Sequence, residues 1–333
     1  MELGLEERKM QPSSAFQQMR ELTQLKAAFP EYQTVHVHVL QNVIKKLGRA
    51  FERMWTLGAG FPRFKSRQHD HSFSFNNTGF RLAGKYLQIA KIGNVKVRLS
   101  REIPDGGVIK SLTVKKSASG WYACFAVDGL PQRLAHSDAI IGIDLGIEDL
   151  AALSDGTFVK NMRVYEQQQK ELRRAQRRLA SRKKGSHGRA KAMRLLARFH
   201  EHIANRRLDY RHKVTTALVR KYGTIILENL NVQSLARGIL SKQVYDAGWS
   251  RLVALLKYKA EGAGRRVIEV DAKYTSQECP ACGHKKRKLL SERVHDCEKC
   301  GYTTHRDTAA AQVILARMEP LGANEGGITP CVA

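Results

Sequence analysis

The run Ala139-Ile-Ile-Gly-Ile-Asp-Leu-Gly146 decides how the second half of the chain folds. Nearly continuous apolar residues lead into Asp144, which is typical of a buried strand that ends in an acid. Two further apolar runs follow, Thr224-Ile-Ile-Leu-Glu228 and Arg266-Val-Ile-Glu-Val270. Helical patterns lie between and after them, at about 162–183, 188–221, 246–261 and 305–317. Strands that alternate with helices predict an α/β layer around a central sheet.

Three carboxylates hold special positions in this layer. Asp144 and Glu228 each end a buried apolar run, where an ionised carboxylate is costly unless a cation offsets its desolvation. Asp307 begins the last helix, as an N-cap or first-turn acid would. Each acid alone has an ordinary structural explanation, but the three together can hold two Mg²⁺ ions for phosphodiester hydrolysis. We discount three acids that flank a solvated hairpin turn, Glu148, Asp149 and Asp155.

Four of the six cysteines form two C-x-x-C pairs, Cys279-Pro-Ala-Cys282 and Cys297-Glu-Lys-Cys300. Two such turns can present four thiolates to one tetrahedral zinc ion, and since four thiolates close the coordination shell, the site is expected to be structural. The alternatives are two unrelated buried pairs or a redox motif. Four cysteines leave no vacancy for the nearby histidines, His284, His295 and His305. We expect Cys124 to be a buried small hydrophobe in an apolar strand.

The charge of the chain points to nucleic acid. Its 333 residues include 57 Lys and Arg against 31 Asp and Glu, a formal net charge of +26, which favours a polyanionic partner. Residues 160–213 hold more than half of this excess. A merely solvated face usually mixes both signs, so we interpret this segment as a surface for phosphates. Its candidate contacts are Arg173, Arg174, Arg177, Arg178, Arg182, Lys183, Lys184, Arg189 and Lys191.

The first part of the chain has a different pattern. Residues 1–60 are helical in pattern, with an apolar stripe through Val39, Val43, Leu47, Phe51, Met54 and Trp55. Residues 61–136 contain short alternating runs, which predict an antiparallel sheet or barrel. The sequence has no run of 18 apolar residues, and its start lacks the features of a signal peptide, so we expect a cytoplasmic protein with no membrane partner.

With these pieces placed, the chain resembles the TnpB family, small RuvC-type nucleases that are encoded in insertion sequences and related to type V CRISPR effectors. The motifs occur in family order over roughly residues 40–317: Pro62-Arg-Phe-Lys65, Gly142-Ile-Asp-Leu-Gly146, Ser181-Arg-Lys-Lys-Gly-Ser186, Leu227-Glu-Asn-Leu230, Tyr258-Lys-Ala260, Tyr274-Thr-Ser-Gln277, the two cysteine units and Arg306-Asp307. Arg63 and Lys65 of the first motif are further candidate contacts for nucleic acid.

The resemblance implies an RNase H-like (RuvC) nuclease core with a zinc-ribbon insertion, preceded by a helical lobe and a β-barrel. The expected divisions are a helical lobe at 1–60, a barrel at 61–136, a nuclease domain at 137–273 and 303–318, a ribbon at 274–302 and a flexible tail at 319–333. The catalytic acids would be Asp144, Glu228 and Asp307, served by Mg²⁺ or Mn²⁺ in two-metal catalysis.

The resemblance also implies an activity and its partners. The expected function is RNA-guided cleavage of DNA by a monomer that binds a guide RNA from the transposon end and a target DNA, with base pairing supplying sequence recognition. The alternatives are a non-cleaving or decayed homologue that acts as a guided repressor, and a transposase that performs strand transfer with the same acids.

Two departures from the family pattern matter. His305 and Ala309 stand where the family usually has Asp and Asn around the third acid. The family chain also normally opens with a strand that nothing before the helical region matches, which would follow from a miscalled start or a decayed copy. We therefore expect a barrel short of one strand, with the segments 72–75 and 80–83 as the spare candidates to fill the gap.

Overall fold

The computed structural model describes residues 14–64, 71–129, 133–230, 235, 237–238, 241–289 and 292–318. Lys65 and the expected tail at 319–333 lie outside the described residues. The chain divides into two compact units, one up to residue 130 and one from residue 131 onward. Each unit has its own hydrophobic core and is treated by itself below.

The second unit is built on a five-stranded mixed sheet. Three strands form an antiparallel meander: β7 (Ile140–Asp144), β8 (Asp149–Leu153) and β9 (Phe158–Lys160). Two more, β10 (Thr224–Glu228) and β11 (Arg266–Val270), run parallel to β7, and the order across the sheet is β11-β10-β7-β8-β9. The strands predicted from the apolar runs therefore form one sheet, with β7 and β10 in its centre.

Helices connect and cover this sheet. Four of them lie close to the predicted ranges: α3 (Val164–Ala180), α4 (His187–Lys221), α7 (Trp249–Ala263) and α8 (Arg306–Ala316). The short helix α6 (Ser241–Ala247) was not predicted. The C-terminal part of α4 packs on the core through Val214 and Leu218, where it meets Leu252 and Leu256 of α7. At 1.5 Å per residue, the 35 residues of α4 span roughly 50 Å. The rest of α4 therefore extends past the sheet.

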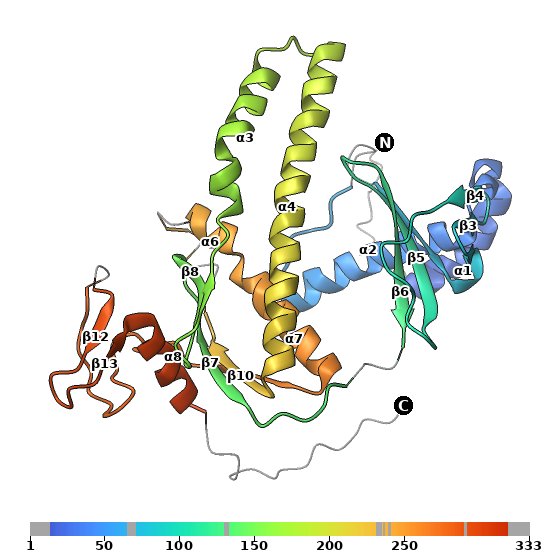
Figure 1. Ribbon diagram of the computed structural model, residues 1–333. Coiled ribbons are helices and arrows are strands. Elements are labelled where there is room, and N and C mark those ends of the chain that lie inside the picture. Colours follow the sequence, from blue (N-terminus) through green and yellow to red (C-terminus); the bar gives the residue numbers. More distant parts are fainter. Residues whose placement is uncertain are drawn as a thin grey trace, which may run out of the picture. The chain divides into compact units, whose positions relative to one another are not determined.

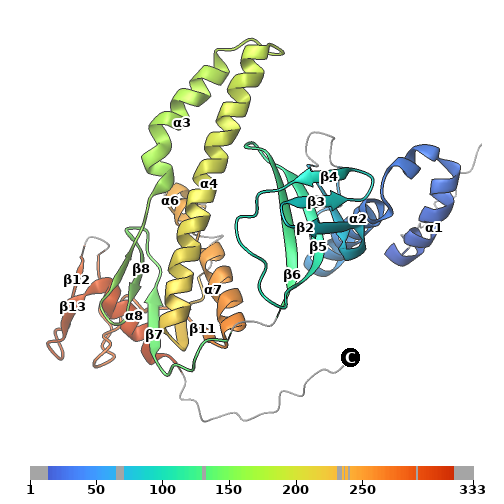
Figure 2. The same ribbon diagram turned by 45° about the vertical axis from the view of Figure 1, so that its right-hand side comes forward.

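The extended part of α4 pairs with α3 in a helical hairpin, which projects from the sheet in Figures 1 and 2. A small apolar cluster of its own, with Val164, Leu172 and Ile203 as its buried members, holds the two helices together. Arg189 stabilises the turn between them, because its Nη1 donates to the carbonyl oxygens of Leu179 at 3.0 Å and Arg182 at 3.1 Å. Leu179 lies in the last turn of α3, where carbonyls lack partners within the helix, and its oxygen also accepts from the backbone N–H of Arg182 at 3.3 Å.

One glycine fixes how α8 lies on the sheet. A Cβ atom added to Gly142 in the middle of β7 would lie 2.2 Å from the carbonyl oxygen of Ala311 and 2.9 Å from the backbone nitrogen of Leu315. Both are backbone atoms and cannot move aside as a flexible side chain could. Only glycine at this position lets the backbone of α8 contact the central strand directly.

A small cysteine-bearing ribbon precedes α8, with strands β12 (Val294–Asp296) and β13 (Thr303–His305). Tyr302 connects this ribbon to the core, because its hydroxyl donates to Gln312 of α8 at 2.7 Å. Gln312 in turn donates to the carbonyl of Ser154 at the end of β8, at 3.4 Å. The ribbon is thus joined to the sheet through the helix that follows it.

The first unit combines helices with two antiparallel sheets. The helical part consists of α1 (Ala15–Ala28), the 3₁₀ turn η1 (Pro30–Thr34) and α2 (Val37–Leu57). One sheet has β1 (Ser72–Asn76), β5 (Val108–Lys116) and β6 (Trp121–Asp128) in the order β1-β5-β6; the other has β2 (Phe80–Ala83), β3 (Tyr86–Ile89) and β4 (Gly93–Lys96), with η2 (Asn77–Gly79) between β1 and β2. Figure 2 shows both sheets.

The two sheets share one core, made by Phe75 and Leu112 from one sheet and Leu87 and Ile89 from the other. Both segments expected to fill the gap in a barrel, at 72–75 and 80–83, form strands. Among the described residues no strand pairing joins the two sheets, so the closed barrel stays a prediction.

The apolar stripe of the second helix is only partly covered: Val43 is 54% and Trp55 61% exposed, whereas Val39 packs on the core of the sheets. Cys124 is exposed on the outer face of β6, so the expectation of a buried small hydrophobe is wrong. No helix in the described part of the chain has the length and apolar character that a membrane span needs.

Candidate active site and metal-binding ribbon

Asp144 and Glu228 end neighbouring central strands. Asp144 is the last residue of β7 and Glu228 the last residue of β10. These strands are parallel, and Leu227 pairs with Ile143 one position earlier, so the two acids leave the sheet at the same edge. Adjacent strands lie about 4.8 Å apart. The register therefore places the two carboxyl groups side by side.

Asp307 reaches the same edge from the first turn of α8. The N-cap of this helix is His305, whose Nδ1 accepts a hydrogen bond from the backbone N–H of Asp307 at 3.3 Å. The His305 ring also packs edge to face on Phe158 of β9, with ring centroids 4.9 Å apart. Ala309 is buried at 1% exposure. The two departures from the family pattern thus have structural roles here, one as a helix cap and one in the core.

The pKa shifts report how closely these acids interact. Burial, together with the negative charges of Glu228 and Asp307, raises the pKa of Asp144 to about 8, against the opposing charge of Arg306. Burial also raises the pKa of Glu228, while a hydrogen bond from Thr275 and the charge of Arg317 act in the opposite direction. Buried like charges that disfavour each other's ionisation are a usual mark of a functional site. A divalent cation would relieve this repulsion.

Two arginines lie beside the acids and are held by backbone carbonyls. The Nη1 of Arg306 donates to the carbonyl of Leu289 at 2.7 Å, and the Nη1 of Arg317 to that of Asp271 at 2.6 Å. Arg317 also pairs with Glu278 at 2.9 Å. Both guanidinium groups are therefore positioned charges that partly balance the carboxylates.

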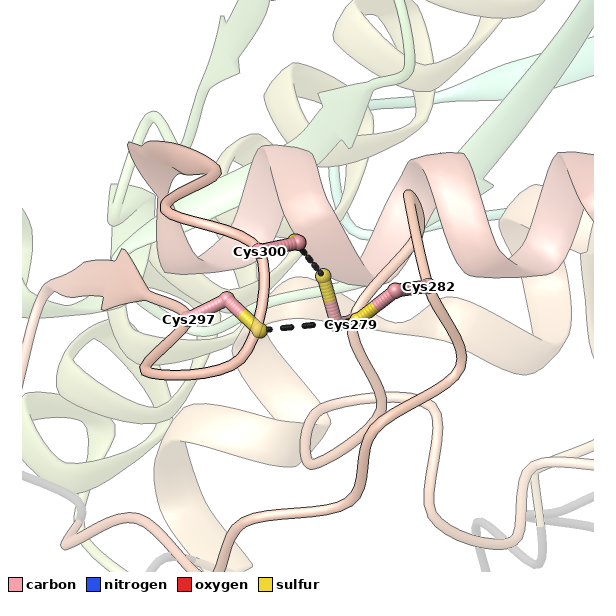
Figure 3. Close-up of side chains that lie close together, drawn as sticks. All are labelled: Cys279, Cys282, Cys297 and Cys300. Atoms are coloured by element: carbon pink, nitrogen blue, oxygen red, sulfur yellow. Dashed lines mark hydrogen bonds between the residues drawn. The ribbon is translucent and has the colours of Figure 1, made fainter.

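The four cysteines meet in the ribbon, as Figure 3 shows. Their Sγ atoms all lie within 4.8 Å of one another, with Cys282 and Cys297 3.6 Å apart and Cys279 and Cys300 3.7 Å apart. Within the described ranges, no other set of His, Cys, Asp or Glu ligand atoms comes together as a group of this kind. The four cysteines therefore form one cluster, as expected, and the alternative of two unrelated buried pairs is excluded.

The turns that carry the cysteines suit a metal ion. Gly283 and Gly301, with φ of +69° and +73°, each follow a pair and donate a backbone hydrogen bond to the first cysteine of that pair, at 2.9 and 2.8 Å. Backbone N–H groups of Cys300 and Lys299 lower the pKa of Cys297 to about 6. Metals bind the thiolate form of cysteine. The donor set, four sulfurs in two tight turns, therefore fits a tetrahedral thiophilic ion.

The arginines and lysines predicted to contact nucleic acid lie mainly on the α3–α4 hairpin. The members exposed to solvent are Arg173, Arg174, Arg177, Arg178, Arg182, Lys183, Lys184 and Lys191, while Leu172 and Ala175 form the buried face of α3. Arg189 is half-buried and bonded within the turn. Arg63 is exposed on the first unit, and Lys65 lies outside the described residues.

Several functional contacts were not foreseen from the sequence. Asp246 of α6 has a side chain only 9% exposed that pairs with Arg207 of α4 and accepts from the backbone N–H of Tyr165, so it holds the base of the hairpin. Thr275 donates to the Glu228 carboxylate. Neither contact has a local signal, because each joins residues far apart in the chain.

Asp155 is also more than a solvated acid. Its carboxylate accepts hydrogen bonds from Thr157, Lys221 and Tyr222. Although partial burial opposes it, these bonds lower the pKa of Asp155 to about 2. The turn between β8 and β9 is therefore tied to the C-terminal end of α4.

Comparison with known proteins gives consistent matches. Residues 113–238 match a family described as "Probable transposase" (OrfB_IS605), and residues 249–314 match the Cas12f1-like TNB domain. The chain is 34% identical to the "Putative RNA-guided DNA endonuclease InsQ" of Escherichia coli K12, over 83% of this chain and 73% of that protein. A protein of Streptomyces pristinaespiralis with the same endonuclease name is 33% identical over 87% and 74%.

Among solved structures, the chain is similar in fold to Cas12f1 in its cryo-EM complex with single-guide RNA and target DNA. The TM-score is 0.53 at 15% sequence identity, over 83% of this chain and 70% of that one. At this identity the similarity concerns the fold.

We expect Asp144→Asn and Asp155→Asn to change stability in opposite directions. The folded-state pKa of Asp144 lies above the unfolded value of about 4, so the unfolded chain ionises first and stability falls from about pH 4 to pH 8. Asp144→Asn should abolish this loss and raise the melting temperature at pH 7.

Asp155 contributes stability above pH 4 that disappears toward pH 2. Asp155→Asn should therefore lower the melting temperature by about 2–4 °C, since its partly exposed hydrogen-bond network is worth ~1 kcal/mol.

Thermal unfolding from pH 4 to pH 8 checks both changes. The buffer should lack magnesium and also chelator, which would strip the cysteines of metal. A lower melting temperature for Asp144→Asn than for the unchanged chain would contradict the desolvation argument.

Proposed function

The chain belongs to the TnpB family, and we propose that it is an RNA-guided DNA endonuclease that hydrolyses phosphodiester bonds at Asp144, Glu228 and Asp307. The observation that supports the proposal is that Asp144 and Glu228 end adjacent parallel strands and that burial, together with the charges of Glu228 and Asp307, raises the pKa of Asp144 to about 8. Relatives named as RNA-guided DNA endonucleases, at 34% and 33% identity, supply the reaction class.

The sheet order supports an RNase H-like core. An antiparallel meander, β7-β8-β9, followed by two strands parallel to its first member is the arrangement that the resemblance implies. In such a core the acids at the ends of β7 and β10 and on α8 would hold Mg²⁺ or Mn²⁺. Two such ions activate a water and stabilise the leaving oxygen.

The residues of the chain would share the remaining work. The carboxylates of Asp144, Glu228 and Asp307 would hold the ions at the sheet edge. Arg306, held by the Leu289 carbonyl, places a positive charge beside the acids, where a scissile phosphate would lie. The close contact between α8 and Gly142 keeps Asp307 in register with Asp144.

Guide RNA and target DNA are the proposed partners. The exposed arginines and lysines of the hairpin would bind the sugar–phosphate backbone, which sets affinity and register without reading sequence. Sequence recognition would come from pairing between guide and target. The basic hairpin thus accounts for most of the charge excess.

The cysteine cluster would hold one structural zinc ion. Four thiolates leave no open position for a substrate or water, which argues against a catalytic ion and against a redox role. The ion would stabilise the fold of the ribbon, because the ribbon strands have only three residues each and bury little apolar surface.

The description of the matched family as "Probable transposase" favours one competing function, strand transfer by the same acids. Hydrolysis leaves free DNA ends, whereas transfer joins the ends to a second DNA. A cleavage assay that scores joined products therefore separates the two reactions.

We expect Asp144→Asn, Glu228→Gln and Asp307→Asn each to reduce guided DNA cleavage by on the order of 10³-fold or more, since each removes a metal ligand worth several kcal/mol in the transition state. Guide binding should change little, because the basic hairpin is left intact. Asp138→Asn, at an exposed acid just before β7, is the matched control and should cleave normally. Undiminished cutting by purified Glu228→Gln would remove Glu228 from the site.

The purified chain should carry about one zinc ion per molecule. Cys297→Ser should lower the zinc content and expose the ribbon to proteolysis, because metal binding supplies most of the folding energy of a small metal domain. Cys124→Ser, at an exposed cysteine outside the cluster, should leave both unchanged. Elemental analysis with limited proteolysis measures these effects, and full activity in a zinc-free preparation would exclude the assignment.

Replacing Arg173, Arg174, Arg177 and Arg178 together by glutamine should weaken guide binding and flatten its salt dependence. Each lost phosphate contact should reduce the slope of log K against log salt by roughly 0.7 to 0.9. The corresponding lysine variant retains the charge and should keep most of the slope. An unchanged slope and affinity in the glutamine variant would mean that this face is only solvated.

A further inference from the structure

Glu228 has an unusual neighbour, Thr275, on the loop that follows β11. Both residues are buried, at 7% and 4% exposure, and the Thr275 hydroxyl donates to Oε1 of Glu228. In the described part of the chain, Thr275 is the hydrogen-bond donor that contacts this carboxylate. No hydrogen bond of the described residues involves the other oxygen, Oε2.

The Thr275 hydroxyl has a second acceptor within reach, the carbonyl of Ala272 at 3.2 Å. One proton cannot serve both oxygens fully, and an ionised carboxylate is the stronger acceptor. A threonine that merely satisfied its own loop would need only the carbonyl. The hydrogen bond to Glu228 is therefore not needed to satisfy the Thr275 hydroxyl within its own loop.

The backbone around Thr275 is held in a specific and strained form. Tyr274 has φ of +63°, in the left-handed region that residues other than glycine rarely adopt. Its carbonyl accepts from the N–H groups of Gln277 at 2.9 Å and Glu278 at 3.0 Å, closing a tight turn. Such strain persists where the surroundings impose it, and it tends to mark functional sites.

The same turn leads directly into the metal-binding ribbon. Glu278 pairs with Arg317 at 2.9 Å, and the N–H of Cys279, the first cysteine of the cluster, donates to the carbonyl of His284 at 2.8 Å. Thr275 is four residues before Cys279, so the residue that contacts Glu228 and the first cysteine of the cluster belong to one short segment. The ribbon can thus fix where the Thr275 hydroxyl points.

We propose that Thr275 is a positioning residue that orients the Glu228 carboxylate for divalent metal binding, through a turn anchored on the cysteine ribbon. This inference rests on the proposed function, because it assigns Thr275 a role in the site formed by Glu228. Partners that hydrogen-bond to metal-ligating carboxylates set the ligand's orientation, and their loss costs about 10- to 100-fold in metal affinity or activity.

The test compares the unchanged chain with four single variants. Thr275→Val removes the donor at nearly constant volume, Thr275→Ser keeps the donor, Ser276→Ala is a matched control on the same turn, and Glu228→Gln removes the ligand. The readouts are Mn²⁺ affinity of the zinc-loaded protein by electron paramagnetic resonance, the Mg²⁺ concentration that half-saturates guided cleavage, zinc content and melting temperature.

We expect Thr275→Val to weaken Mn²⁺ binding and to raise the half-saturating Mg²⁺ concentration by about 10- to 100-fold. Zinc content should not change. Thr275→Ser and Ser276→Ala should behave as the unchanged chain. Adding Thr275→Val to Glu228→Gln should have no further effect on Mn²⁺ binding, since the group to be positioned is already altered.

If Glu228→Gln abolishes cleavage, two results overturn the inference while leaving the proposed function intact. One is an unchanged Mn²⁺ affinity and Mg²⁺ dependence in Thr275→Val. The other is an equal loss of metal affinity in Thr275→Val and Thr275→Ser. Equal losses would mean that packing rather than the hydroxyl matters. If Glu228→Gln itself binds Mn²⁺ and cleaves normally, the proposed function fails first. Should Thr275→Val not fold, Thr275→Ala replaces it as the variant without a donor. It is then compared with Thr275→Ser and Ser276→Ala by the same readouts.

Discussion

The contact between the backbone of α8 and Gly142 of β7 is the constraint on which the candidate site depends. Asp144 and Glu228 are brought together by strand register alone, but Asp307 comes from a helix that no hydrogen-bond ladder attaches to the sheet. A Cβ atom at position 142 would clash with backbone atoms of Ala311 and Leu315 and so push α8 away from the sheet. Because well-packed interiors transmit such shifts, the third carboxylate would move with the helix.

The acids of the candidate site also lower the stability of the folded chain. Carboxylates at the ends of central strands are desolvated, and their charges disfavour one another. The chain offsets part of this with Arg306 and Arg317, which are themselves held by backbone carbonyls. Asp155 has the opposite character, because its carboxylate is surrounded by donors and joins two elements. Two acids near the same sheet therefore affect stability in opposite directions at neutral pH, Asp144 unfavourably and Asp155 favourably.

The sequence predicts those parts of the structure whose cause is local. The strands that end at Asp144 and Glu228, the helices of the basic hairpin and the cysteine turns all follow from apolar runs, helical periodicity and spacing within a few residues. Such signals specify an element and the end at which an acid emerges. They also place Asp144 and Glu228 at one edge, since the parallel central strands β7 and β10 end together, whereas the position of Asp307 depends on how α8 packs on the sheet.

The remaining features depend on contacts between distant residues. No local pattern shows that His305 caps α8, that Thr275 meets Glu228 or that Asp246 holds Arg207, because each contact exists only after folding. The apolar pattern of α2 shows an amphipathic helix but does not say how much of the stripe the unit covers, and Val43 and Trp55 stay exposed. Likewise, alternating strands indicate sheets without deciding whether those sheets close into a barrel.

The late position of Asp307 has a consequence for synthesis of the protein. The three acids are separated by 84 and 79 residues along the chain, and the helix that carries the third follows the cysteine ribbon. The sheet strands and the basic hairpin are therefore synthesised before α8. With Asp307 as a metal ligand, as proposed, cutting would have to wait until this last helix docks on Gly142, whereas the proposed RNA-binding hairpin would already be complete. The order of the segments would thus separate RNA binding from the onset of nuclease activity in time.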